Sequence, residues 1–109
     1  MKKGRQSQDF ELVRSGAGEL SLSGQMDHDT VVRARELGER LLAEEQGPWR
    51  INLGGLESAH SGVLSLLLCF LRAADRHQQS ITFVEMPDRL YDMARMSGLD
   101  QLLPLEQRG

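Results

Sequence analysis

The sequence of 109 residues has a single cysteine, no long apolar run and little concentrated positive charge, and each shortage excludes a class of protein. Cys69 cannot form an internal disulfide and is typical of a chain kept in a reducing compartment. The longest apolar stretch, residues 63–71, is about half of the ~20 residues that span a membrane. Lys2, Lys3 and Arg5 precede polar rather than apolar residues, so we expect no signal peptide and no direct membrane insertion.

Acidic residues outnumber basic ones, 16 against 13, and the formal net charge of −3 is spread along the chain rather than gathered in blocks. Because nucleic-acid binding needs a concentrated Lys/Arg face, this composition argues against a nucleic-acid partner. The length predicts one domain over residues 1–109, with a core at about 9–105 and frayed tails. A chain of this size can bury roughly two-thirds of its unfolded surface.

Two kinds of hydrophobic periodicity divide the chain into seven elements. Alternating segments bounded by glycines predict strands, and segments with apolar residues on one arc predict helices. In chain order, we expect a hairpin of strands 9–14 and 18–24, a helix from Asp27 to about Gln46 and a strand at 49–55. These are followed by a helix from Ser61 to about Gln78, a strand at 80–86 and a helix that begins at Pro87 and closes at a left-handed Gly98.

This order, β-β-α-β-α-β-α, predicts the α/β class. Strand–helix–strand units pair their strands in parallel, so a small mixed sheet should form, with an N-terminal hairpin and the helices packed mainly on one face. In the first helix, one apolar arc is shared by Val31, Ala34, Leu37, Gly38, Leu41 and Leu42. Val32 lies off this arc.

The helix predicted at residues 61–78 is apolar around almost its whole circumference. A helix on a sheet needs an apolar arc of a little over 100°. Leu68 and Cys69, beside the polar stripe, therefore exceed what the sheet contact requires. Either neighbouring helices cover them, or they form an exposed patch for a partner. The sequence also leaves open whether isolated copies form a homodimer through this surface.

The sequence offers little for catalysis or metal binding. His60 and Ser61 are adjacent, a position from which side chains rarely meet in the geometry of a base and a nucleophile. We interpret Ser61 as the N-cap of the second helix. Cys69 and His77 would lie about 12 Å apart along that helix, too far to share a zinc ion. We therefore expect no catalytic residue, no metal and no cofactor.

Residues 51–74, INLGGLESAHSGVLSLLLCFLRAA, resemble the signature of STAS domains, a family that includes anti-sigma factor antagonists and the tails of sulfate transporters. That signature is an apolar strand, a variable loop, Asp-Ser/Thr-Ser/Gly-Gly-Leu and an apolar helix. Residues 86–105, MPDRLYDMARMSGLDQLLPL, are most similar to the MlaB-type subgroup. The resemblance covers about residues 9–105.

The resemblance implies a protein–protein interaction module rather than an enzyme. MlaB-type domains bind the ATPase subunit (MlaF-like) of a phospholipid ABC transporter that also contains a permease and a periplasmic lipid-binding ring. We therefore expect a cytoplasmic subunit, peripheral to the inner membrane, that supports outer-membrane lipid asymmetry. The alternative implied by the same family is an anti-sigma factor antagonist-like switch that binds a serine kinase or anti-sigma factor.

A gapless alignment from Asn52 places His60 on the family's aspartate, Ser61 on the first hydroxyl residue and Gly62 on the phosphoacceptor position. Val63 replaces the usual glycine. In this register the phosphoacceptor hydroxyl is missing, whereas a gapped register makes Ser61 a candidate for phosphorylation. The resemblance and the apolar surplus together predict partner contacts at His60, Ser61, Gly62, Leu64 and Leu68.

Overall fold

The computed structural model describes residues 10–106 and contains the seven predicted elements in the predicted order. Their bounds are β1 Phe10–Gly16, β2 Glu19–Gly24, α1 His28–Glu44, β3 Trp49–Leu56, α2 Ser61–Arg76, β4 Ile81–Val84 and α3 Asp88–Met96, followed by a short 3-10 helix, η1 Leu99–Gln101. Asp9, predicted to begin the first strand, and most of both predicted frayed tails lie outside the described residues.

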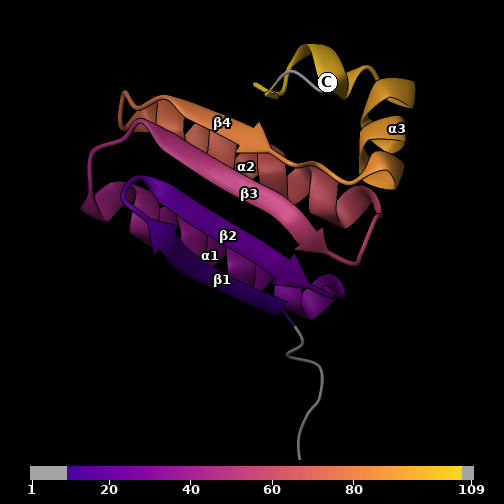
Figure 1. Cartoon of the computed structure of the whole chain (residues 1–109), viewed down its shortest axis with the longest axis horizontal. Coiled ribbons are helices and arrows are strands. Elements are labelled where there is room, and N and C mark those ends of the chain that lie inside the picture. Colours follow the sequence, from indigo (N-terminus) through magenta and orange to yellow (C-terminus); the bar gives the residue numbers. More distant parts are fainter. Residues whose placement is uncertain (1–9, 107–109) are drawn as a thin grey trace, which may run out of the picture.

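The four strands form one mixed sheet in the order β1-β2-β3-β4. β1 and β2 are the predicted antiparallel hairpin, while β2 pairs with β3 and β3 with β4 in parallel. Figure 1 shows α1 and α2 side by side behind one face of this sheet, with α3 beyond the end of β4. The predicted fold class, with helices mainly on one face, is confirmed.

Alternation along the strands directs one set of side chains toward the helices. In β3, Trp49, Ile51 and Leu53 are buried, whereas Arg50 is exposed and Asn52 is half-buried on the opposite face. Apolar burial of this kind contributes roughly 25 cal/mol per Å² of surface removed from water. The core therefore lies between the sheet and the α1–α2 pair.

α1 and α2 approach each other closely at Gly38. A Cβ atom built on Gly38 would lie 2.3 Å from a ring carbon of Phe70, which is fully buried on α2. No side chain is compatible with that distance unless the helices or the ring move. Glycine at this position, although costly to helix propensity, lets the Phe70 ring fill the space between the two helices.

A partly buried polar network lies at the end of the molecule where α1 and α2 terminate. The side-chain amide of Gln79 donates to the carbonyl oxygen of Leu42 at 2.6 Å, and its Oε1 accepts from the backbone N–H of Gly47 at 2.9 Å. The same oxygen accepts from the indole N–H of Trp49. One side chain in a short linker thus satisfies polar groups from α1, from the α1–β3 loop and from β3.

The C-terminal segment returns to the sheet. Gly98 adopts the left-handed conformation predicted for it, with φ 76°, while Pro87 occupies the N-cap of α3 rather than the predicted first helical position. The backbone N–H of Phe83 donates to the carbonyl oxygen of Pro104, and that of Glu106 donates to the carbonyl of Phe83. These bonds cover the outer edge of β4.

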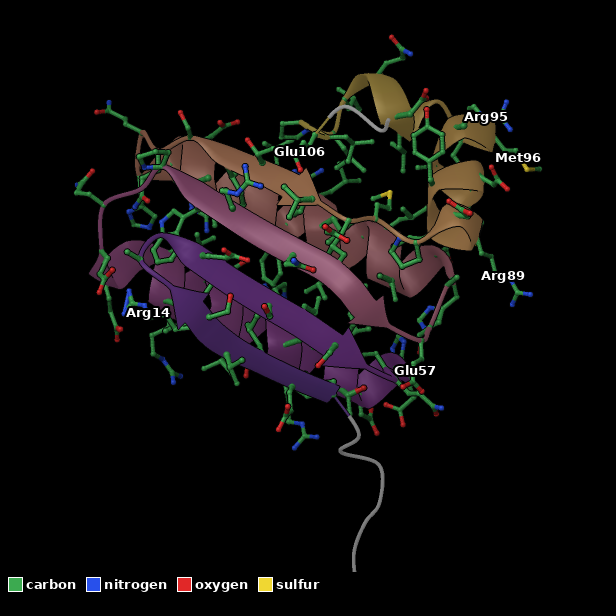
Figure 2. All side chains as sticks on the ribbon, in the orientation of Figure 1. Arg14, Glu57, Arg89, Arg95, Met96 and Glu106 are labelled. Atoms are coloured by element: carbon green, nitrogen blue, oxygen red, sulfur yellow. The ribbon has the colours of Figure 1, made fainter. Side chains whose placement is uncertain are left out.

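α3 presents a polar outer surface. Arg89, Arg95 and Met96 point away from the body of the protein in Figure 2. Met96 is 83% exposed, whereas Met86, just before α3, is buried. Within residues 10–106, no helix is long and apolar enough to cross a membrane.

Candidate docking site

Two loops meet at the edge of the sheet where the parallel strands β2 and β3 end; one leads into α1 and the other into α2. The backbone N–H of Glu57 donates to the carbonyl oxygen of Gly24 at 2.8 Å. The backbone N–H of Met26 donates to the hydroxyl oxygen of Ser58, also at 2.8 Å. These bonds between the loops hold the N-termini of the two helices next to each other.

The N-cap of α2 is His60, one residue before the predicted cap Ser61. His60 has an extended backbone, and its Nδ1 accepts a hydrogen bond from the backbone N–H of Gly62 at 3.1 Å. An imidazole nitrogen thus provides the acceptor that the sequence suggested would come from a serine hydroxyl. Ser61 becomes the first helical residue, and it is exposed.

The N-terminus of α1 is fixed by a capping box between Asp27 and Thr30. The carboxylate of Asp27 accepts from the backbone N–H of Thr30 at 2.9 Å, and the backbone N–H of Asp27 donates to the Thr30 hydroxyl at 2.8 Å. The bonds from the Thr30 amide and the Thr30 hydroxyl lower the pKa of Asp27 from its ordinary value of 3.8. The sequence placed the start of this helix at Asp27 but did not single out Thr30, which is buried.

A groove of about 460 Å³ lies between the two helix N-termini. It is lined by His28, Val31, Val32, His60, Ser61, Gly62 and Ser65. Val32, the residue that falls off the apolar arc of α1, is 42% exposed. The misfit in periodicity was therefore a signal for this groove. The site combines an apolar side from α1 with small polar residues from α2.

The structure brings together three of the five predicted contact residues: His60, Ser61 and Gly62 all line the groove. Leu64 is only 4% exposed and belongs to the core, so it supports the site from beneath instead of offering surface to a partner. Leu68 is half-buried and packs against the core. Neither residue lines the groove.

The position of the His60 ring leaves room only for glycine at residue 62. A Cβ atom at this position would lie 3.0 Å from two atoms of the His60 ring and 3.8 Å from a methyl group of Val31. The first distance is tighter than ordinary contact, so a larger residue would displace the imidazole. The glycine thus keeps the His60 ring in place and also leaves the groove open.

The geometry around His60 does not favour nucleophilic catalysis. One ring nitrogen accepts from the Gly62 amide, and the other, Nε2, lies 2.8 Å from the carbonyl oxygen of Met26. Neither nitrogen is left to take a proton from Ser61. In the part of the chain that the structure describes, no three His, Cys, Asp or Glu side chains are placed to hold a metal ion.

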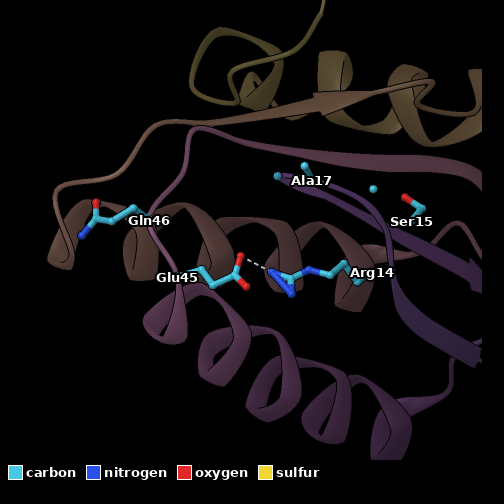
Figure 3. Close-up of a pocket in the computed structure, with 7 residues that line it drawn as sticks. Arg14, Ser15, Ala17, Glu45 and Gln46 are labelled. Carbon is cyan, nitrogen blue, oxygen red and sulfur yellow. Dashed lines mark ion pairs between the residues drawn. The ribbon is translucent and has the colours of Figure 1, made fainter.

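A second hollow, of about 620 Å³, lies at the opposite end of the molecule. It is formed by the hairpin turn at residues 15–18 and the C-terminus of α1, and the ion pair between Arg14 and Glu45 spans it, as Figure 3 shows. The guanidinium of Arg14 also lies over the ring of Trp49, 5.7 Å from its centroid. Because Arg14 is already paired within the chain, this hollow is a weaker candidate for docking.

Comparison with known proteins agrees with the fold. The family model described as "Mlab, STAS domain" matches residues 12–104. A search of curated protein sequences gives no significant match.

Several solved structures share the fold. The anti-sigma factor antagonist SpoIIAA in its unphosphorylated form has a TM-score of 0.69 at 16% identity, over 91% of this chain and 89% of that one. An anti-sigma factor antagonist from Mycobacterium paratuberculosis has a TM-score of 0.69 at 19% identity, over 91% and 85%. The phosphorylated form of SpoIIAA from Bacillus has a TM-score of 0.65 at 16% identity, over 91% and 92%. At these identities the similarity concerns the fold alone.

Proposed function

Because this chain belongs to the MlaB-type STAS domain family, we propose that it is a non-catalytic subunit of an Mla-type phospholipid ABC transporter. STAS domains act through protein–protein interactions. In our proposal the partner is the transporter's ATPase subunit, which this subunit binds and supports on the cytoplasmic side of the inner membrane. The complex would also contain a permease and a periplasmic lipid-binding ring, and it would contribute to outer-membrane lipid asymmetry.

The observation that carries the proposal is the groove between the N-termini of α1 and α2. It has an exposed apolar side chain, Val32, beside the exposed hydroxyl residue Ser61. An apolar centre with a small polar rim is the usual composition of a protein–protein contact. The small residues Gly62 and Ser65 on the α2 side let a partner approach that helix closely.

The test is affinity purification of the tagged protein from its native cell, with identification of the proteins that co-purify. We expect an ABC transporter ATPase and its permease. Ser61→Arg should abolish this co-purification, because a long cation would fill the groove. The matched control is Ser80→Arg, since Ser80 is an exposed serine at the other end of the molecule, next to the Gln79 network. Equal recovery of the ATPase by both variants would exclude the groove as the interface.

Deletion of the gene gives an independent test of the transporter proposal. We expect a weakened outer-membrane barrier, measured as sensitivity to detergent combined with a chelator. A clean deletion strain with full resistance, in which the ATPase remains abundant and active, would contradict the proposed role.

Protein purified from the native cell also distinguishes the proposed transporter subunit from the alternative function, a switch controlled by phosphorylation. Ser61 is exposed at the start of α2, where a kinase could reach it. In our proposal the intact mass of the native protein carries no added phosphate, and Ser61→Ala still recovers the ATPase. Phosphate on Ser61, together with co-purification of a serine kinase or anti-sigma factor, would favour the switch instead.

A further inference from the structure

His60 connects the two sides of the docking groove through both of its ring nitrogens. Nδ1 lies 3.1 Å from the backbone nitrogen of Gly62, in the first turn of α2. Nε2 lies 2.8 Å from the carbonyl oxygen of Met26, in the loop that leads into α1. The imidazole is therefore a bridge between the segments that begin the two helices.

These partners determine which form of the ring is present. A peptide N–H can only donate, so Nδ1 must accept from Gly62, and a carbonyl oxygen can only accept, so Nε2 must donate to Met26. Only the neutral imidazole with its proton on Nε2 makes both bonds. A second proton would have to enter on Nδ1, where it would face the N–H of Gly62 and remove the cap.

We infer that the neutral imidazole of His60 is a positioning group that sets the spacing of the two helix N-termini, and that partner binding in the groove depends on it. The identity of the partner rests on the proposed function, whereas the role of the ring does not. Loss of either bond of the ring releases the first turn of α2 from the α1 loop and weakens binding.

Other titratable side chains lie on the same elements, and their effects on binding must be distinguished from that of His60. On the α1 side these are Asp27, His28 and Asp29, and on the α2 side Glu57, which accepts a hydrogen bond from Gln25. His28 lines the groove but lies on α1. His77→Gln therefore provides the matched control, because it removes an exposed imidazole at the other end of α2, outside the groove, while leaving the bridge intact.

The decisive variant is His60→Asn. Asparagine is among the best N-cap residues, so α2 should still form, but its shorter side chain does not reach across to Met26 as the imidazole does. At neutral pH we expect ATPase recovery to fall roughly two- to tenfold, the effect of one lost hydrogen bond. Recovery should stay at the wild-type level in His77→Gln, which keeps both bonds of the bridge. Equal recovery of the ATPase by wild type and His60→Asn would overturn the inference.

The isolated domain tests the ring without any partner. Nitrogen-15 shifts of His60 should report a neutral ring with its proton on Nε2, and His60→Asn should move the resonances of the Met26 carbonyl and the Gly62 amide. A ring with its proton on Nδ1, or a variant that leaves both resonances unmoved, would disprove the bridge. If the bridge is present but no ATPase is ever recovered, the proposed function fails while the positioning role is retained.

Discussion

At one end of the α1–α2 pair, Gln79 connects the end of α1 to β3; at the other, His60 connects the loop before α1 to the start of α2. Both are single side chains in linkers, and both satisfy backbone groups across more than 30 residues of sequence. At the Gln79 end, called the closed end below, the bonds involve the fully buried indole of Trp49, and the hollow beside them is spanned by the ion pair between Arg14 and Glu45. The His60 end keeps a groove beside the bonded groups.

This difference suggests that the closed end serves mainly the stability of the fold, and the end with the groove mainly the binding of a partner. A polar group that bridges buried elements is costly to remove, since its partners lose their hydrogen bonds inside the protein. A side chain that only lines an open groove, such as Val32, can change without disturbing the core. We therefore expect substitutions at the closed end to affect unfolding and substitutions at the open end to affect binding.

The largest expected effect is at the closed end. Gln79→Ala leaves three groups without their partner: the carbonyl of Leu42, the amide of Gly47 and the indole N–H of Trp49. We expect a loss of about 2–4 kcal/mol in the free energy of unfolding, measured by urea denaturation. The neighbouring exposed residue provides the control, because Gln78→Ala should change stability by no more than about 0.5 kcal/mol. Similar losses in the two variants would show that the network contributes little.

The contact between the helices, midway between the two ends, should give the next largest effect. Gly38→Ala places a methyl group against the Phe70 ring and should cost about 1–3 kcal/mol through overpacking. Phe70→Leu in the same chain makes room for this methyl. The double variant should therefore be more stable than the sum of the two single losses predicts. If the stability losses of the two single variants add exactly, the methyl group is accommodated by separation of the helices and not by movement of the Phe70 ring.

The order of the elements and both ends of most of them could be predicted from the sequence, because periodicity and caps are local signals. The α2 cap could not be placed to the residue. Ser61 is the better cap by residue type, yet His60 is the residue with extended backbone, and its ring reaches the Gly62 amide. The choice was decided by the loop from β3, which brings His60 within reach of Met26.

Burial on α2 was also only partly predictable. The wide apolar arc was real, but α2 contacts α1 and α3 as well as the core against the sheet; Leu64 belongs to that core and Leu68 packs against it. Periodicity gives the width of an apolar face and not the number of elements that cover it. Gln79 carried no signal at all, since a glutamine in a short linker looks the same whether exposed or bridging.

A smaller effect on stability, with a large effect on binding, is expected at the open end. Val32→Lys replaces an exposed groove residue on a helix and should change the free energy of unfolding by no more than about 0.5 kcal/mol. Recovery of the ATPase should fall about fivefold or more, the effect of an interface residue worth about 1 kcal/mol. Val13→Lys is the matched control, since Val13 is similarly exposed on β1. Equal loss of binding in the two variants would point to charge rather than to the groove.

The smallest expected effect concerns acid, and it too distinguishes the two ends. The bonds from Thr30 lower the pKa of Asp27, so folding favours the charged carboxylate. The stability that this cap contributes is present above the ordinary pKa of 3.8 and is lost as the pH falls through the lowered value. Asp27→Asn keeps an acceptor for Thr30 but cannot titrate there. Between about pH 5 and pH 2, urea midpoints should therefore fall further in wild type than in Asp27→Asn.

Any contribution from the other carboxylates, which the two proteins share, cancels when the proteins are compared at each pH. The closed end should respond differently, because the Gln79 network consists of amide, indole and peptide groups that carry no charge. In wild type, acid should therefore accelerate hydrogen exchange at the first amides of α1 before it does so at Gly47. If both sites lose protection together in the wild-type protein, the two ends unfold as one unit and the proposed division between them fails.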